Sequence, residues 1–141
     1  MGQKNYLWKR EIRLMRIKNL PLSSGAQVFK ALSEEPRIRI LHLLLRSDQL
    51  CITDLERVLD FTQAKTSRHL TYLKNSGIVS STKIDQWSFY FIKEEISDFV
   101  NQALEYLNRD QVLQQDLVSY QDLYNSGELA SFRLKAKNTA G

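Results

Sequence analysis

ITDLERVLDFTQAKTSRHLTYLKNSGIV, at residues 52–79, is the stretch that decides the fold. It predicts a short helix, a tight joint and a longer helix with a polar outer face. This order of elements is typical of a helix-turn-helix, whose second helix enters the major groove of DNA. Thr53 with Glu56 has the form of a capping box for the first helix, and Thr62 is the expected cap of the second. Gly77 is expected to end the second helix in a left-handed conformation.

The second helix has an inner and an outer face. A period of 3.6 residues turns Thr66, Leu70 and Leu73 inward. The remaining side chains are rich in the hydrogen-bonding groups that base edges and phosphates accept. We therefore expect a DNA-binding set made of Thr62, Gln63, Lys65, Ser67, Arg68, His69, Thr71 and Tyr72. The alternative is that these side chains form an ordinary solvent-exposed helix face. The position of this helix, after a capped helix and before a hairpin, disfavours that alternative.

Two β-type runs follow at residues 78–83 and 87–92, and together they predict a hairpin. A hairpin directly after a helix-turn-helix is typical of a wing. Lys83 and Gln86 are the wing residues expected to contact DNA, chiefly at phosphates. Asp85 at the tip repels phosphate, so the wing is expected to read little sequence.

The rest of the chain is predicted to be mainly helical. Periodicity indicates helices over about 4–18, 26–33 and 94–124, and a buried, nearly all-apolar helix that starts around Pro36. Residues 108–110 are expected to bend or break the 94–124 helix. The expected fold class is mostly α with a small β-hairpin, a winged helix-turn-helix whose helical termini form a dimer interface. We expect four segments: a basic N-terminal helix (1–22), a DNA-binding domain (23–93), one or two dimerisation helices (94–126) and a flexible tail (127–141).

Apolar stripes in the C-terminal helical region predict a homodimer. Burying one large apolar side chain contributes about 1.5–3 kcal/mol, so several of them favour the pairing of two subunits. A two-fold pair also holds two reading helices about 34 Å apart, one turn of the duplex, and so selects an inverted repeat. Packing of the same stripes within one subunit is the alternative. The expected dimerisation residues are Ile96, Phe99, Val100, Ala103, Leu104, Leu107, Leu113, Leu117, Tyr120 and Tyr124.

The charge of the chain is unevenly distributed. The formal net charge is +4; residues 1–22 hold six Lys or Arg and one Glu, whereas residues 94–141 hold four Lys or Arg and eight acidic residues. A basic front and an acidic back suit a protein that meets phosphates with one face. We assign the basic N-terminal helix to the dimer seam with some help on phosphates; a DNA arm and an anionic membrane surface are alternatives. The sequence shows neither a membrane span nor a signal-peptide pattern, so we expect a cytoplasmic protein without membrane partners.

Three segments of the chain resemble the ArsR/SmtB-type bacterial repressors. VFKALSEEPRIRIL, at residues 28–41, is similar to the FKALADPTRLRIL-type segment with which that family opens. LCITDL, at residues 50–55, is similar to its LCVCDL segment, and QAKTSRHL, at residues 63–70, is similar to the start of its recognition helix. The resemblance covers about residues 26–93 and reproduces several spacings at once.

The resemblance implies a homodimeric, sequence-specific regulator of bacterial transcription, expected to be a repressor. Such a protein binds an inverted-repeat operator in double-stranded DNA and commonly releases it when an effector binds. The resemblance also implies that the 96–124 stripe is the dimer seam and that the DNA-facing set includes Gln63, Lys65, Ser67, Arg68 and His69.

The usual metal sites of that family are not reproduced in the sequence. Cys51 stands at the first position of the family's cysteine pair, but Thr53 stands at the second. The two histidines of the chain are His42 and His69, so the 94–124 region has none. Soft-metal sites usually need three or four thiolates or imidazoles. We therefore expect no metal and no cofactor, and leave a small-molecule effector unidentified; a metal- or thiol-responsive repressor with an atypical site is the third interpretation.

Two other classes of function compete with a regulator. A protein-interaction module that keeps the winged fold without reading DNA is the main alternative, and the acidic wing tip favours it. An enzyme is disfavoured, because the chain has five glycines, no phosphate-cradling glycine run, and no Cys/His or Ser/His/Asp set at an interpretable spacing.

Overall fold

The computed structural model of the protein describes residues 20–140. The expected helix over residues 4–18 lies outside the described residues. The described helices are α2 (Leu22–Ala31), α3 (Glu35–Ser47), α4 (Ile52–Leu59), α5 (Gln63–Asn75), α6 (Glu94–Glu105), α7 (Gln111–Asn125) and α8 (Ala130–Ala140). The strands are β1 (Leu50–Cys51), β2 (Val79–Ile84) and β3 (Trp87–Ile92). Within residues 20–140, no helix has the combined length and apolar character that crossing a membrane requires.

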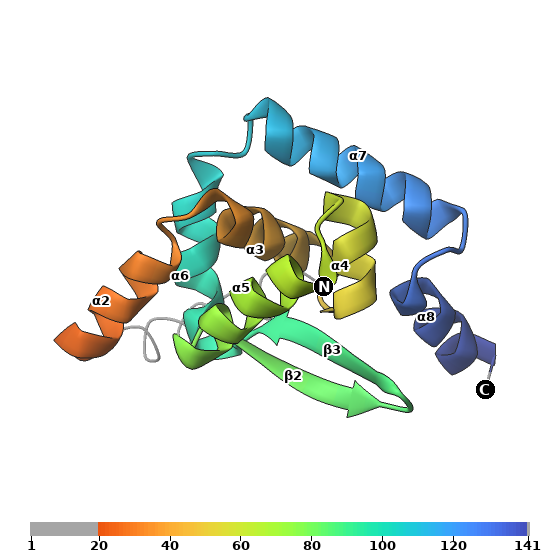
Figure 1. The fold of residues 1–141 in the computed structure, drawn as a ribbon, viewed down its shortest axis with the longest axis horizontal. Helices are drawn as coiled ribbons and strands as arrows, with labels where there is room; N and C mark the ends of the chain where they lie inside the picture. Colours follow the sequence, from red (N-terminus) through yellow and green to blue (C-terminus); the bar gives the residue numbers. More distant parts are fainter. Residues whose placement is uncertain (1–19, 141) are drawn as a thin grey trace, which may run out of the picture.

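Helix α3 lies at the centre of the described fold, and α4, α5, α6 and α7 pack around it (Figure 1). Its side chains Ile40, Leu41 and Leu43 are fully buried, as expected for a helix that is apolar nearly all round. Pro36 stands in the first turn, where a missing N–H leaves no hydrogen bond unmade. The expected fold class, mostly α with a small antiparallel sheet, is confirmed.

The sheet has three strands in the order β1-β3-β2, all antiparallel. The expected hairpin of β2 and β3 is confirmed, with Ile84 paired to Trp87 next to the tip. The additional strand β1 pairs Cys51 with Phe89. It was not predicted, because two residues are too short to show the alternation that identifies a strand.

The helix-turn-helix itself shows one confirmed cap and one wrong one. Thr62 Oγ1 accepts a hydrogen bond from the backbone N–H of Lys65 (3.2 Å), as expected for the cap of α5. The capping box at the start of α4 is wrong, because Cys51 is the N-cap residue and Thr53 lies inside the first turn. The cause is the short strand: pairing with β3 keeps the backbone extended as far as Cys51, so the helix begins directly after it.

The expected break between residues 108 and 110 is confirmed, because α6 ends at Glu105 and α7 begins at Gln111. The Asp110 carboxylate accepts a hydrogen bond from the N–H of Val112 (2.8 Å) and so caps α7.

The flexible tail expected at residues 127–141 is wrong for most of its length, because α8 occupies Ala130–Ala140. The Asp54 carboxylate on α4 accepts hydrogen bonds from the N–H groups of Ala130 (2.8 Å) and Ser131 (3.1 Å). Leu129, just before the helix, is fully buried. Helix α8 therefore covers the face of the sheet that carries Phe89, where Cys51, Phe89 and Ala130 form a small apolar cluster.

Candidate nucleic-acid interface

Helix α5 is fixed to the core along one side. Thr66, Leu70 and Leu73 have exposed fractions of 0%, 1% and 0%, which confirms the expected inner face. Asp60 closes α4 with a left-handed backbone (φ 56°), and Phe61 turns inward, 8% exposed, just before the cap of α5. This three-residue joint and the buried stripe orient α5 as a rigid rod with its other side in solvent.

The outward side of α5 carries most of the expected DNA-binding residues. Thr62, Gln63, Ser67, Arg68 and Thr71 are exposed, and Lys65 and Tyr72 are half-buried. The first turn has no acidic residue, so the positive end of the helix dipole is not offset locally. Amides at the helix start, together with these side chains, form a surface with the hydrogen-bond donors that anions and base edges can accept.

Tyr72 packs against Arg37 of α3 instead of projecting freely. The Arg37 guanidinium lies 4.0 Å from the centre of the Tyr72 ring. Arg37 is only 4% exposed and donates hydrogen bonds to the carbonyl oxygens of Ala31 (2.7 Å) and Lys30 (3.1 Å). Sequence reasoning missed this anchor; an arginine in a helix expected to be buried is the feature that would have indicated it.

The expectation that His69 faces DNA is wrong. His69 is 4% exposed, and its Nδ1 lies 4.0 Å from the Glu34 carboxylate. Burial lowers the pKa of His69, and the positive charges of Arg68 and Arg37 lower it further. The helical period placed His69 on a flank, and only the tertiary position of the α2–α3 connection decides that this flank is covered.

Lys65 packs its ammonium group over an aromatic ring. Lys65 Nζ lies 4.2 Å from the centre of the Phe61 ring, and the Arg39 guanidinium lies 5.0 Å from the same ring centre. Arg39 in turn donates two hydrogen bonds to Asp116 on α7, both of 2.9 Å. This pairing with Asp116 raises the pKa of Arg39. The start of α5 is therefore connected to α7 through Arg39 and Phe61, a link between residues too distant in sequence for any local pattern to indicate.

The wing carries its expected residues on the surface. Lys83 and Gln86 are both exposed. Asp85 at the tip pairs with Lys137 of α8 (Nζ to Oδ2, 3.1 Å), so its charge is partly offset. Lys74 at the end of α5 donates a hydrogen bond to Ser81 of β2 (3.2 Å) and connects α5 to the wing.

Four of the ten expected dimerisation residues are buried inside the subunit. Ile96, Val100, Leu104 and Leu113 are between 0% and 6% exposed, so their assignment to a seam between subunits is wrong. The stripe of α6 faces α3, which buries it within one chain. The other six expected members are partly or largely exposed. Leu107 is 41% exposed, and the half-buried ones are Phe99, Ala103, Leu117, Tyr120 and Tyr124.

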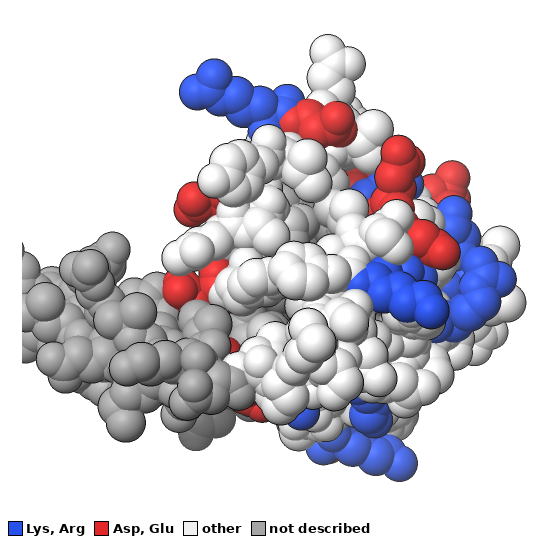
Figure 2. Space-filling model, turned by 90° about the vertical axis from the view of Figure 1, so that its left-hand side faces the viewer, with Lys and Arg blue, Asp and Glu red and all other residues white. Residues whose placement is uncertain are grey.

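An apolar surface lies instead on the side formed by α2 and α6. Leu22, Phe29 and Tyr106 are 90%, 64% and 92% exposed. Phe29 meets Phe99 edge to face with ring centres 5.6 Å apart. Figure 2 shows this side as a broad area of uncharged atoms with the Lys and Arg side chains gathered at its margins. We call these four residues, with Ala103, the α2–α6 face.

The groups that could bind a soft metal are buried and separate. Cys51 is fully buried, with Sγ 3.0 Å from Thr53 Oγ1, and burial raises the pKa of its thiol. His42 is 1% exposed, and burial together with the Arg46 charge lowers its pKa. In the described part of the chain, no three or more His, Cys, Asp or Glu side chains are grouped to hold a metal ion.

The sequence and the fold of the chain are both similar to those of known proteins. Residues 34–81 match the sequence profile described as "Bacterial regulatory protein, arsR family". The chain is 40% identical over 78 residues to the cadmium resistance transcriptional regulatory protein CadC of Listeria innocua, a match that covers 55% of this chain and 66% of CadC. It is 30% identical over 79 residues to the arsenical resistance operon repressor of Bacillus subtilis, covering 55% of this chain and 75% of that protein. Among solved structures, the homodimeric winged helix-turn-helix DNA-binding domain of Mb0332 from Mycobacterium bovis shares the fold, with a TM-score of 0.56, 24% identity, and coverage of 64% of this chain and 87% of that one.

Proposed function

We propose that the chain, which belongs to the arsR family of bacterial regulatory proteins, regulates transcription by binding double-stranded DNA through α5. The outward side of α5 is the observation that carries the proposal, because a capped, rigid helix presents Gln63, Ser67 and Arg68 as exposed side chains. The relatives are named as a regulator and a repressor, and repression is the mode we propose. We propose no catalytic activity.

Each contact has a role that follows from its chemistry. Arg68 suits the O6 and N7 acceptors of guanine, and Gln63 suits the N6 and N7 edge of adenine. Lys65, Thr62 and the wing residues Lys83 and Gln86 are assigned to phosphates, which position the protein without reading sequence.

Selection of binding sites from a pool of random duplexes tests the proposal. The protein is expected to enrich one inverted repeat, with affinity that falls steeply as salt rises. Arg68→Ala should cost about 1–3 kcal/mol on that site and relax the choice of base, whereas Lys83→Ala should weaken all duplexes about equally. Arg109→Ala, which removes an exposed charge from the α6–α7 connection, is the matched control. Equal affinity for selected and scrambled duplexes would instead favour a protein-interaction module.

We propose that the α2–α6 face joins two copies of the chain into a homodimer. Leu22, Phe29 and Tyr106 leave large apolar areas in water in the described subunit, and burial of each contributes about 1.5–3 kcal/mol. Phe29→Glu should convert the dimer to a monomer in analytical ultracentrifugation. Val118→Glu charges another exposed apolar residue, on α7, and should leave the dimer intact. The reverse pattern would place the seam on α7.

Metal gating is the second candidate, because the two relatives are named for cadmium and arsenical resistance. We propose that this chain is not gated in that way, since a metal needs the thiolate and the Cys51 thiol is buried with a raised pKa. Titration of DNA binding with Cd²⁺ and with arsenite should leave the affinity unchanged. Release of DNA that Cys51→Ser abolishes would overturn the proposal.

A further inference from the structure

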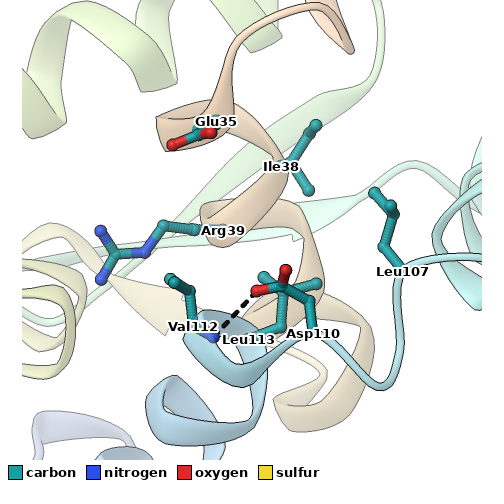
Figure 3. A pocket seen from close by; sticks show the side chains of 7 residues that line it. All are labelled: Glu35, Ile38, Arg39, Leu107, Asp110, Val112 and Leu113. Carbon is teal, nitrogen blue, oxygen red and sulfur yellow. Dashed lines mark hydrogen bonds between the residues drawn. The ribbon is translucent and has the colours of Figure 1, made fainter.

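A cavity of about 290 Å³ lies where the first half of α3 meets the connection between α6 and α7. Its apolar walls come from Ile38, Leu107, Val112 and Leu113, and Glu35, Arg39 and Asp110 complete the lining (Figure 3). Leu107 and Val112 are 41% and 51% exposed, so the cavity opens to solvent. Apolar walls with a few polar groups are typical of sites for small molecules.

The charges around this cavity favour a cation. Arg39 contributes positive charge to the lining, but both carboxylate oxygens of Asp116 already hold its guanidinium. Glu35 and Asp110 are exposed carboxylates on opposite sides of the cavity. One oxygen of Asp110 accepts the N–H of Val112, and Figure 3 shows the other directed toward α3. A carboxylate oxygen can accept a further charge-assisted hydrogen bond from an ammonium group.

Arg39 also connects the cavity to the reading helix. Its guanidinium lies over Phe61, the residue before the cap of α5, and the same ring supports the Lys65 ammonium. A second positive charge beside Arg39 would repel the guanidinium and weaken its contact with Phe61. The first turn of α5, where Lys65 stands, would lose part of its support.

We propose that this cavity binds a small organic cation with a compact apolar body, and that its occupation lowers the affinity of α5 for DNA. The second half of the inference rests on the proposed DNA-binding function; the first half does not. Because coupling between two sites is reciprocal, DNA also lowers the affinity for the cation by the same factor.

Titration of the full chain with benzylamine, followed by calorimetry and NMR, tests the site without DNA. Saturable binding of one molecule per chain is expected. Benzyl alcohol, which has a similar shape but no charge, should bind about tenfold more weakly. Asp110→Asn should weaken benzylamine to a similar degree while an asparagine still caps α7. Val112→Trp should fill the cavity and abolish binding, whereas Val118→Trp, on the same helix away from the lining, should not. Equal binding by the two probes, or benzylamine binding that survives Val112→Trp, overturns the site.

The coupling is tested on a selected duplex at constant ionic strength. Saturating benzylamine should lower DNA affinity at least about fivefold for the unmodified chain and leave the Val112→Trp variant unaffected. Benzylamine binding without any change in DNA affinity overturns the coupling. If the chain binds benzylamine but prefers no duplex, the proposed DNA-binding function is contradicted while the cation site remains supported.

Discussion

Helix α5 is capped by Thr62, its own N-cap residue, whereas α8 is capped by Asp54, which lies 76 residues earlier in the chain. The cap of α5 satisfies one N–H group with a hydroxyl oxygen at the surface. That of α8 satisfies two N–H groups with a carboxylate that is 2% exposed. The difference shows that the start of α5 is fixed by a residue next to it in the sequence, whereas the start of α8 is fixed by a residue on α4 that only the tertiary fold brings close.

Removal of the distant cap should have the largest effect. Asp54→Ala leaves the N–H groups of Ala130 and Ser131 without their acceptor and should lower the free energy of unfolding by about 3 kcal/mol, because hydrogen bonds to charged groups are the strong ones. Urea denaturation measures the loss. Hydrogen exchange should show that amides of α8 lose protection while those of α5 keep it.

The matched variant is Asp54→Asn, which keeps one oxygen acceptor and should lose less. Unchanged protection of α8 in Asp54→Ala would mean that apolar contact of Ala130 with Cys51 and Phe89, not the carboxylate, fixes the helix.

The two helices also differ in their titratable groups. Helix α5 carries a buried histidine, His69, and the described part of α8 carries none. Burial lowers the pKa of His69, with Arg68 adding to the effect, and burial lowers the pKa of His42 on α3, with Arg46 adding. The unfolded chain therefore binds these protons more readily. Stability should be full above pH 6.5 and should fall as the pH drops through the lower pKa of the folded state.

Each unit by which such a pKa is lowered corresponds to about 1.4 kcal/mol. Denaturation of the unmodified chain and of a His42→Gln, His69→Gln double variant between pH 7.5 and about 5 measures the effect. The double variant should show the flatter profile, although it starts from lower stability. Parallel profiles would mean that carboxylates set the pH dependence.

The contrast between α5 and α8 also explains what the sequence could predict. The inner stripe of α5, its cap, Gly77 with its positive φ and the break before Asp110 all depend on residues within a few positions, and all were predicted. The missed features depend on partners far along the chain: β1 on β3, α8 on Asp54, and His69 on the connection beside Glu34. The α6 stripe is intermediate, because its period was correct but only packing against α3 showed that it faces inward.

Removal of the local cap should cost less than removal of the distant one. Thr62→Ala should lower the free energy of unfolding by about 1 kcal/mol, the usual cost of an N-cap hydroxyl. Thr62→Ser retains the oxygen and should lose little. Because Thr62 is also assigned to phosphate, the Ala variant should weaken all duplexes by a similar factor. A loss as large as that of Asp54→Ala would contradict the contrast between a surface cap and a buried one.

The smallest effect is expected where α8 reaches the wing tip through an exposed ion pair. Lys137 and Asp85 are 71% and 61% exposed in their side chains, and such pairs contribute less than about 0.5 kcal/mol to stability. Lys137→Ala should therefore leave urea denaturation nearly unchanged. It should still weaken DNA binding slightly and equally for all sequences, because Asp85 then presents an unpaired negative charge near the phosphates. Asp85→Asn in the same background should restore that affinity, since the amide has no charge to offset. If the double variant instead stays as weak as Lys137→Ala, Lys137 itself touches DNA, and α8 belongs with α5 as a binding element.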